Sequence, residues 1–147
     1  GCYLLDGLIE TSRGIAKRGT SRPVIVAIDT EGPELSGRDH GTVREALRSS
    51  GAAFHAVVVG NPVNNSNDRL MVLSLGTRET GGRNDNVLTG NALTERLKRV
   101  AAELTHQYRV TYARPRTLIP PEEVTVSGTN PKLTVRGTPV KEPRESR

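Results

Sequence analysis

Apolar residues in the first part of the chain follow two different patterns. Between residues 3 and 18 they recur every three or four positions, with charged residues between them, which predicts an amphipathic helix ending at Gly19. The runs 23–28 and 52–59 are instead continuous and rich in β-branched residues. Such runs are typical of strands buried on both faces of a parallel sheet. With a helix between them, they predict a compact βαβ unit.

The segment between the two strands starts with a polar loop, residues 29–40. Thr42 and Glu45 have the spacing of a capping box, which predicts that Thr42 caps a short helix ending at Gly51. His55 interrupts the second apolar run, and we expect its side chain to be packed inside the protein.

The second half of the chain contains one strong helix pattern. Apolar residues at helical spacing predict an amphipathic helix that starts near residue 91 and includes Leu104. Ahead of it, we expect a short helix at 70–75, a Thr-Gly-Gly-Arg turn at 80–83 and a minimal strand at 86–88.

Beyond this helix the pattern changes to alternation of polar and apolar residues, which predicts strands at 108–112, 124–126 and 133–135. We expect a β-rich extension over 108–137 and a disordered basic tail over 138–147. The predicted fold class is α/β: a partial doubly wound parallel sheet with flanking helices over residues 1–107, followed by the β-rich extension.

The net charge of +5 is carried by the two ends of the 147-residue chain. Residues 1–22 have four basic and two acidic side chains, residues 23–131 have twelve of each, and residues 132–147 have five and two. A nucleic-acid interface would concentrate basic residues on a folded face with aromatic residues between them, but Phe54 is the one phenylalanine and Trp is absent. Basic ends on a neutral body are the simpler interpretation.

Several function classes find no support in the sequence. One cysteine, Cys2, excludes an internal disulfide framework, and no apolar run approaches the 18 residues of a membrane span. The chain has no Gly-x-Ser-x-Gly elbow, and Gly81-Gly82 lacks the lysine and the spacing of a phosphate-binding loop, so we expect no enzyme. The first residue is Gly rather than Met, which favours a piece of a longer gene product.

Three acidic residues, Asp29, Glu31 and Glu34, follow directly on the end of a predicted strand. One interpretation is a solvated loop that ends the strand. The other is contact with a metal ion or a ligand, because ligands of open α/β sheets bind beyond the carboxyl ends of the strands. Both interpretations stay open at this point.

Five segments in a fixed order carry a family resemblance: Leu4-Leu5-Asp6-Gly7-Leu8, Arg22 to Ile28, Ala46 to Gly51, Thr80-Gly81-Gly82-Arg83, and Ala102 to Tyr112. This order resembles the second half of a von Willebrand factor type A domain, of the bacterial VWFA-related type common in acidobacteria. The resemblance covers residues 1–136. It implies a doubly wound sheet and, in many members, a divalent cation held at a metal-ion-dependent adhesion site.

The resemblance also implies that this metal site is incomplete or degenerate here. Its Asp-x-Ser-x-Ser turn would precede the chain. Cys2, or Gly1 if the register slips by one residue, matches the position of a threonine ligand, although a thiol is a poor ligand for Mg²⁺. Thr30-Glu31-Gly32 matches the family's Thr-Asp-Gly turn, with Glu31 as the candidate metal ligand.

We therefore expect a non-catalytic, adhesion-type module that binds a protein partner through Asp29, Thr30, Glu31 and Glu34. Two alternatives stay open: binding that depends on Mg²⁺ or another divalent cation through Glu31 in a full-length parent, and weak nucleic-acid binding through the basic ends. The family implies a bacterial envelope or secreted location. It also implies a missing strand beside residues 24–28, so we expect an exposed apolar edge and association of the isolated chain, unless the C-terminal strands cover that edge.

Overall fold

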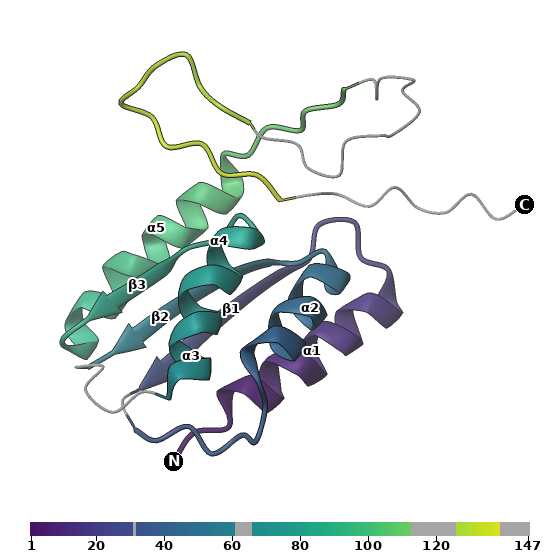
Figure 1. The fold of residues 1–147 in the computed structure, drawn as a ribbon. Coiled ribbons are helices and arrows are strands. Elements are labelled where there is room, and N and C mark those ends of the chain that lie inside the picture. Colours follow the sequence, from purple (N-terminus) through teal and green to yellow (C-terminus); the bar gives the residue numbers. More distant parts are fainter. Residues whose placement is uncertain (31, 61–65, 113–125, 139–147) are drawn as a thin grey trace, which may run out of the picture.

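The computed structural model describes residues 1–30, 32–60, 66–112 and 126–138 of the chain. In this part of the chain, three strands form a parallel sheet in the order β1-β2-β3. The strands are β1 (Val24–Thr30), β2 (Ala53–Val59) and β3 (Asn84–Val87) (Figure 1). Since β2 lies in the middle, β1 and β3 form the two edges of the sheet.

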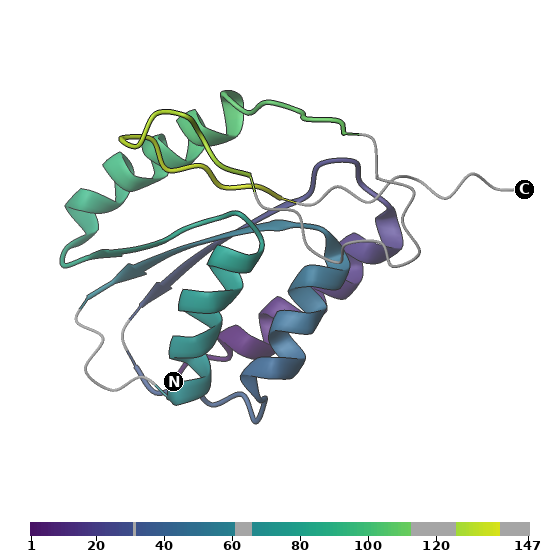
Figure 2. The same cartoon turned by 45° about the horizontal axis from the view of Figure 1, so that its top comes forward.

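Helices lie on both faces of the sheet (Figure 2). One face carries α1 (Leu4–Arg18), α2 (His40–Ser50) and a helical stretch made of α3 (Asn67–Met71), the π-helical turn η1 (Val72–Gly76) and α4 (Thr77–Glu79). The other face carries α5 (Leu93–Thr105), which follows the short 3₁₀ turn η2 (Gly90–Ala92). The structure confirms an α/β fold with a parallel sheet flanked by helices, which is compatible with a Rossmann-like arrangement.

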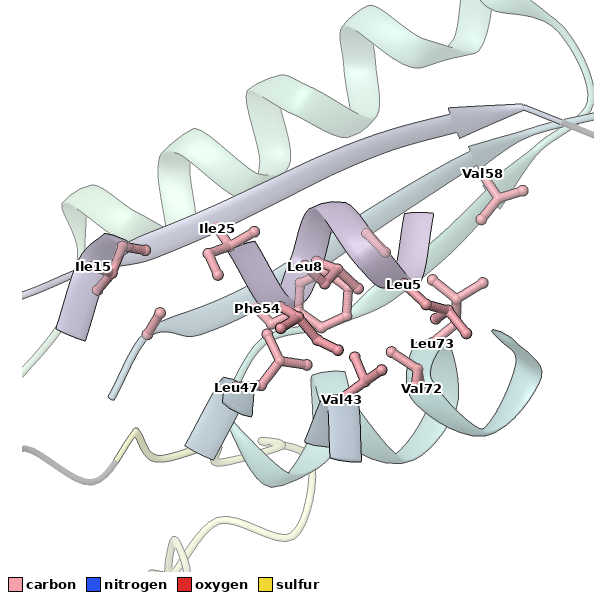
Figure 3. Packing of buried hydrophobic residues seen from close by; sticks show 13 residues of the cluster. Leu5, Leu8, Ile15, Ile25, Val43, Leu47, Phe54, Val58, Val72 and Leu73 are labelled. Atoms are coloured by element: carbon pink, nitrogen blue, oxygen red, sulfur yellow. The ribbon is translucent and has the colours of Figure 1, made fainter. Parts of the chain in front are cut away.

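The main hydrophobic core lies between the sheet and the α1–α2 face (Figure 3). Ile25, Phe54 and Val58 point from the sheet toward Leu5 and Leu8 of α1. The apolar stripe predicted for α1 is therefore the buried face of this helix. The helix ends where Gly19 takes the left-handed conformation, with φ of 59°, as the sequence predicts.

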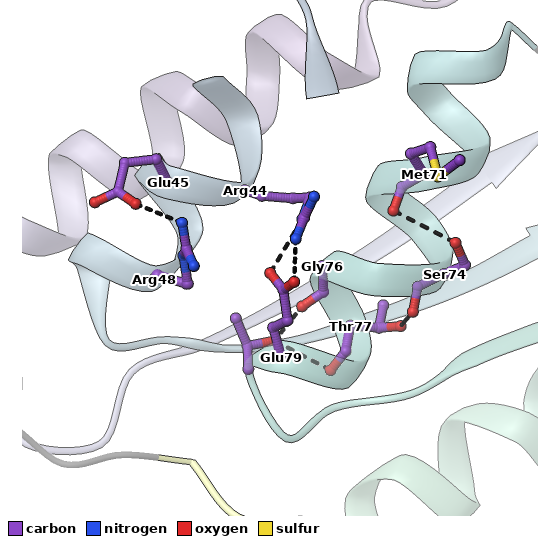
Figure 4. Close-up of polar contacts among 9 residues, drawn as sticks. Arg44, Glu45, Arg48, Met71, Ser74, Gly76, Thr77 and Glu79 are labelled. Atoms are coloured by element: carbon purple, nitrogen blue, oxygen red, sulfur yellow. Dashed lines mark hydrogen bonds and ion pairs between the residues drawn. The ribbon is translucent and has the colours of Figure 1, made fainter. Parts of the chain in front are cut away.

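Polar contacts join α2 to the helical stretch that follows β2 (Figure 4). The guanidinium of Arg44 donates two hydrogen bonds to the carboxylate of Glu79, with both side chains largely shielded from solvent. Within the stretch, the hydroxyls of Ser74 and Thr77 donate to the carbonyls of Leu70 and Leu73, four residues earlier. The Arg44–Glu79 pair therefore ties α2 to the end of the helical stretch that leads into the Thr-Gly-Gly-Arg turn.

The Thr-Gly-Gly-Arg turn completes the hydrogen bonding of β2. The N–H of Phe54 points beyond the start of β3 and donates to the hydroxyl of Thr80 at 3.1 Å. Gly82 lies so close to the same residue that an added Cβ would be 1.8 Å from the Phe54 carbonyl oxygen. The motif singled out in the sequence is therefore a structural joint between α4 and β3.

The prediction that residues 23–28 are buried on both faces is wrong. Strand β1 alternates instead: Ile25 is buried under the helices, whereas Val24, Val26 and Ile28 are 37%, 41% and 53% exposed. On the opposite face α5 packs against β2 and leaves the edge strand β1 largely uncovered. An unbroken apolar run does not show whether a helix covers its second face.

The predicted helix cap of α2 is also wrong in its residue. Asp39 is the N-cap, and its carboxylate accepts both the N–H of Thr42 at 2.9 Å and the Thr42 hydroxyl at 2.5 Å. An aspartate in this position accepts the first free N–H groups of a helix at least as well as threonine does. The helix consequently starts at His40, and its cap lies three residues before the predicted one.

The β-rich extension is not formed in the described residues. The structure has no strand at 108–112 or at 133–135, and 124–125 lie outside the described part. Tyr108 and Val110 are 95% and 71% exposed, so among the described residues the alternating pattern has neither a partner strand nor a face to bury against. The domain boundaries at 107 and 137 stay predictions, and the predicted tail lies outside the described residues from 139 onward.

Candidate functional site

Asp29 lies at the carboxyl end of β1 and is almost completely buried, with 5% exposure. One carboxylate oxygen accepts the N–H of Thr30 at 2.9 Å and the thiol of Cys2 at 3.3 Å. The other accepts a hydrogen bond from the guanidinium of Arg69 at 2.5 Å. The sequence placed Asp29 among the ligand-binding residues, and in the structure its carboxylate is occupied by internal contacts.

Arg69 is the partner that the sequence did not indicate. It lies in α3, which begins after the N-cap Ser66, and its side chain has no exposed surface. Besides Asp29, its guanidinium donates to the carbonyls of Thr30 and Gly32, both at 2.8 Å. A single buried cation therefore fixes the turn that follows β1.

The N-terminal segment closes the other side of this turn. The backbone of Cys2 donates to the carbonyl of Pro33 at 2.9 Å and accepts from the N–H of Leu35 at 2.7 Å. Burial, together with the neighbouring carboxylates of Asp29 and Glu34, raises the pKa of the Cys2 thiol. The thiol is thus held in its protonated form, in which it donates to Asp29 rather than acting as a nucleophile.

Glu34 completes the group of predicted site residues that meet here. One of its carboxylate oxygens accepts the N–H of Ser36 at 3.0 Å. The other is buried without a hydrogen-bond partner among the described residues. The structure therefore brings Cys2, Asp29, Thr30 and Glu34 together at the carboxyl edge of the sheet, whereas Glu31 lies outside the described part of the chain.

The described residues contain no group of three or more His, Cys, Asp and Glu side chains that could hold a metal ion. At Asp29 the compensating positive charge comes from Arg69, whose Nη2 lies 2.5 Å from the carboxylate. The proposed metal ligand Glu31 and the dependence on Mg²⁺ stay predictions.

A second polar group lies under α5, on the opposite face of the sheet. Arg83 contacts Asp85 at 2.9 Å and Glu103 at 2.5 Å, and Arg136 contacts the same Glu103 at 2.5 Å. His55 is buried beside them, with 2% exposure and no partner for Nδ1 in the described part of the chain. The prediction that His55 is packed is confirmed.

Burial lowers the pKa of His55 below the 6.5 of an ordinary imidazole, while Glu103 and Asp85 raise it and Arg136 and Arg83 lower it to smaller extents. As the pH falls through about 6.5, the unfolded chain binds a proton that the folded chain excludes. We therefore expect the free energy of unfolding to fall between pH 7 and pH 5, by at most about 1.4 kcal/mol per pH unit.

Urea titrations at several pH values measure this slope, and His55→Gln should flatten it because glutamine does not titrate. The matched His106→Gln change, on an exposed side chain at the end of α5, leaves His55 and its slope in place. An equal slope in wild type and in the His55→Gln variant would contradict the assignment.

The third candidate surface is the outer edge of β1, formed by Val24, Val26 and Ile28. By the sheet register these side chains share the face of His55 and Val57, which α5 covers on β2 but not on β1. The family resemblance implies an exposed apolar edge at this strand, and β1 is an edge strand with exposed aliphatic side chains in the structure. Val24, Val26 and Ile28 thus form a strip of three exposed aliphatic side chains on one face of β1.

No known protein family, no curated protein and no solved structure matches this chain. The resemblance to von Willebrand factor type A domains therefore stays a prediction. In the described residues, α1 is the longest helix at 15 residues, and neither it nor any other described helix has the length and apolar character to cross a membrane. What the structure defines is an α/β unit with a parallel sheet and one uncovered edge strand.

Proposed function

We propose that this chain is a non-catalytic protein-interaction module and that it binds its partner through the edge strand β1. The observation that carries the proposal is the exposure of Val24, Val26 and Ile28 on one side of a strand whose outer edge pairs with no described strand. Exposed sheet edges bind extended polypeptides by strand addition, with main-chain hydrogen bonds for affinity and alternate side chains for specificity.

The charged residues near the predicted loop site support the same choice of surface. Asp29 is paired with Arg69, and Asp6 of α1 is paired with Arg38 at 2.6 Å. His40 and Asp68 contact each other at 2.8 Å. Side chains already engaged inside the molecule offer less to a partner than an apolar strip with open backbone groups, so we place the interface at β1 rather than at residues 29–40.

The states of the Cys2 thiol and the His55 imidazole also favour binding over catalysis. Burial keeps the Cys2 thiol protonated and the His55 imidazole neutral, and the two lie on opposite sides of the sheet. Nucleic-acid binding through the basic ends stays a prediction, because much of the C-terminal end lies outside the described residues.

Selection from a library of random 12-residue peptides tests the proposed function. We expect enriched peptides to carry aliphatic residues at alternate positions, and we expect Val26→Lys to weaken their binding at least tenfold. Val26 is 41% exposed on an uncovered face, so a lysine there leaves the core intact. Leu88→Lys, at an 82% exposed leucine just past β3, is the matched control and should bind as wild type does.

Circular dichroism of both variants establishes that they are folded before binding is compared. Equal binding of the enriched peptides to the wild type and to Val26→Lys would overturn the proposal, as would failure to enrich any peptide on a chain that stays monomeric.

A further inference from the structure

The open backbone groups of β1 belong to alternate residues. The N–H of Ala53 donates to the carbonyl of Pro23 at 3.1 Å, and Val24 pairs with Ala53 in the parallel register. In such a ladder, odd-numbered residues of β1 direct their N–H and C=O groups toward β2. The groups of Val24, Val26, Ile28 and Thr30 therefore point outward.

Thr30 is not available to a further strand. Its N–H donates to the Asp29 carboxylate at 2.9 Å, and its carbonyl accepts from Arg69 at 2.8 Å. The edge that no described strand covers consequently consists of Val24, Val26 and Ile28, and Val26 is its midpoint. Three N–H and three C=O groups alternate along it, and the same three residues carry the exposed aliphatic side chains.

This edge is complementary to itself. An antiparallel strand with Val26 opposite its own equivalent places Val24 opposite Ile28 and satisfies all six backbone groups. Each cross-strand pair then joins two β-branched side chains on one face, which stabilises an antiparallel pair. We propose that the partner of β1 is a second copy of this chain, related by a two-fold axis through Val26; this inference rests on the proposed function of β1 as an interface.

The two edge strands of the sheet differ in their charged residues, which oppose strand pairing between molecules. Outer strand β3 has the sequence Asn-Asp-Asn-Val, with Asp85 in an ion pair with Arg83. Strand β1 has no charged residue from Val24 to Ile28. Charged side chains on edge strands block pairing between molecules. This distribution of charged residues favours a closed dimer through β1. It disfavours an open-ended assembly in which β1 of one copy pairs with β3 of the next.

In the resulting pair, two sheets of three strands form one continuous sheet. Because the axis is perpendicular to the sheet, both α5 helices lie on the same face, on either side of a strip formed by Val24, Val26 and Ile28 from each copy. The α1 and α2 helices of both copies lie on the other face, over Ile25.

A charge-reversal pair tests the position of the axis, because only the residue on the axis faces its own equivalent. Sedimentation velocity of the wild type over a hundredfold range of concentration should show the mass rise from one chain toward two. Val26→Lys alone and Val26→Glu alone should each stay at one chain, since like charges then face each other. An equal mixture of the two variants should recover the two-chain species, and Leu88→Lys should associate as the wild type does.

Cysteine crosslinking tests the register in a Cys2→Ser background, which keeps a hydroxyl donor for Asp29. Directly opposed Cα atoms in a hydrogen-bonded antiparallel pair are about 5.5 Å apart, within reach of a disulfide or a short bismaleimide. Val26→Cys should crosslink with itself. Val24→Cys and Ile28→Cys should not crosslink alone but should crosslink when the two proteins are mixed.

A single-chain mass at all concentrations, or equal crosslinking of all three cysteine variants alone, overturns the proposal of a second copy. Peptide binding that Val26→Lys abolishes in a chain that stays monomeric would leave the proposed function of β1 intact. If the chain neither associates nor binds peptides in a way that depends on Val26, then β1 is not an interface.

Discussion

Replacing Gly82 by alanine is expected to leave the chain largely unfolded. The added Cβ would lie 1.8 Å from the carbonyl oxygen of Phe54, 2.5 Å from its carbonyl carbon and 3.2 Å from the nitrogen of His55. All three are backbone atoms of the central strand, so no side chain can turn away to make room. We expect a loss of about 4 kcal/mol or more, which approaches the lower end of the about 5–15 kcal/mol that stabilises an ordinary domain.

Urea unfolding followed by far-ultraviolet circular dichroism measures this effect. Gly7→Ala is the matched control, because Gly7 is an exposed residue inside α1 and an added Cβ meets nothing within 4 Å. Alanine should stabilise that helix by roughly 0.5–1 kcal/mol. Replacing glycine by alanine should thus change the free energy of unfolding in opposite directions at the two positions. An unfolding midpoint of Gly82→Ala close to that of the wild type would contradict the packing described for the Thr-Gly-Gly-Arg turn.

The parts of the fold that the sequence predicts well are those fixed by local periodicity. Three predicted elements match observed ones, with starting residues that agree within one or two positions. They are the helix over residues 3–18, the strand over 52–59 and the helix that includes Leu104. The parts it predicts poorly depend on coverage by distant segments. Residues 23–28 look like a central strand until α5 is seen to leave β1 largely uncovered, and the alternation at 108–112 joins no sheet among the described residues.

The candidate site divides in the same way. Asp29 and Glu34 meet Cys2 because the carboxyl end of β1 and the start of α1 lie at one edge of the sheet, which the expected topology implies. Arg69 is 40 residues from Asp29 and follows the polar residues Asn67 and Asp68, so nothing in the sequence separates it from a solvated charge. Its role is set by tertiary contacts alone.

Arg69→Met is the second substitution with a large expected effect. The change leaves the Asp29 carboxylate, which is 5% exposed, without its cationic partner, and it leaves the carbonyls of Thr30 and Gly32 without donors. Breaking one side of a buried ion pair costs about 3 to 5 kcal/mol. Urea unfolding measures the loss, and hydrogen exchange should show faster amide exchange at Leu35, whose N–H is held by Cys2 in the same turn.

A double variant separates the cost of a stranded charge from the loss of packing. In Arg69→Met/Asp29→Leu both buried charges are absent, so most of the stability lost in Arg69→Met should return. Arg38→Met breaks the exposed contact with Asp6 and should change stability little. If the double variant is less stable than Arg69→Met by the full cost of Asp29→Leu, the two side chains are not coupled. The segment after β1 would then be held mainly by the backbone hydrogen bonds of Cys2 to Pro33 and Leu35.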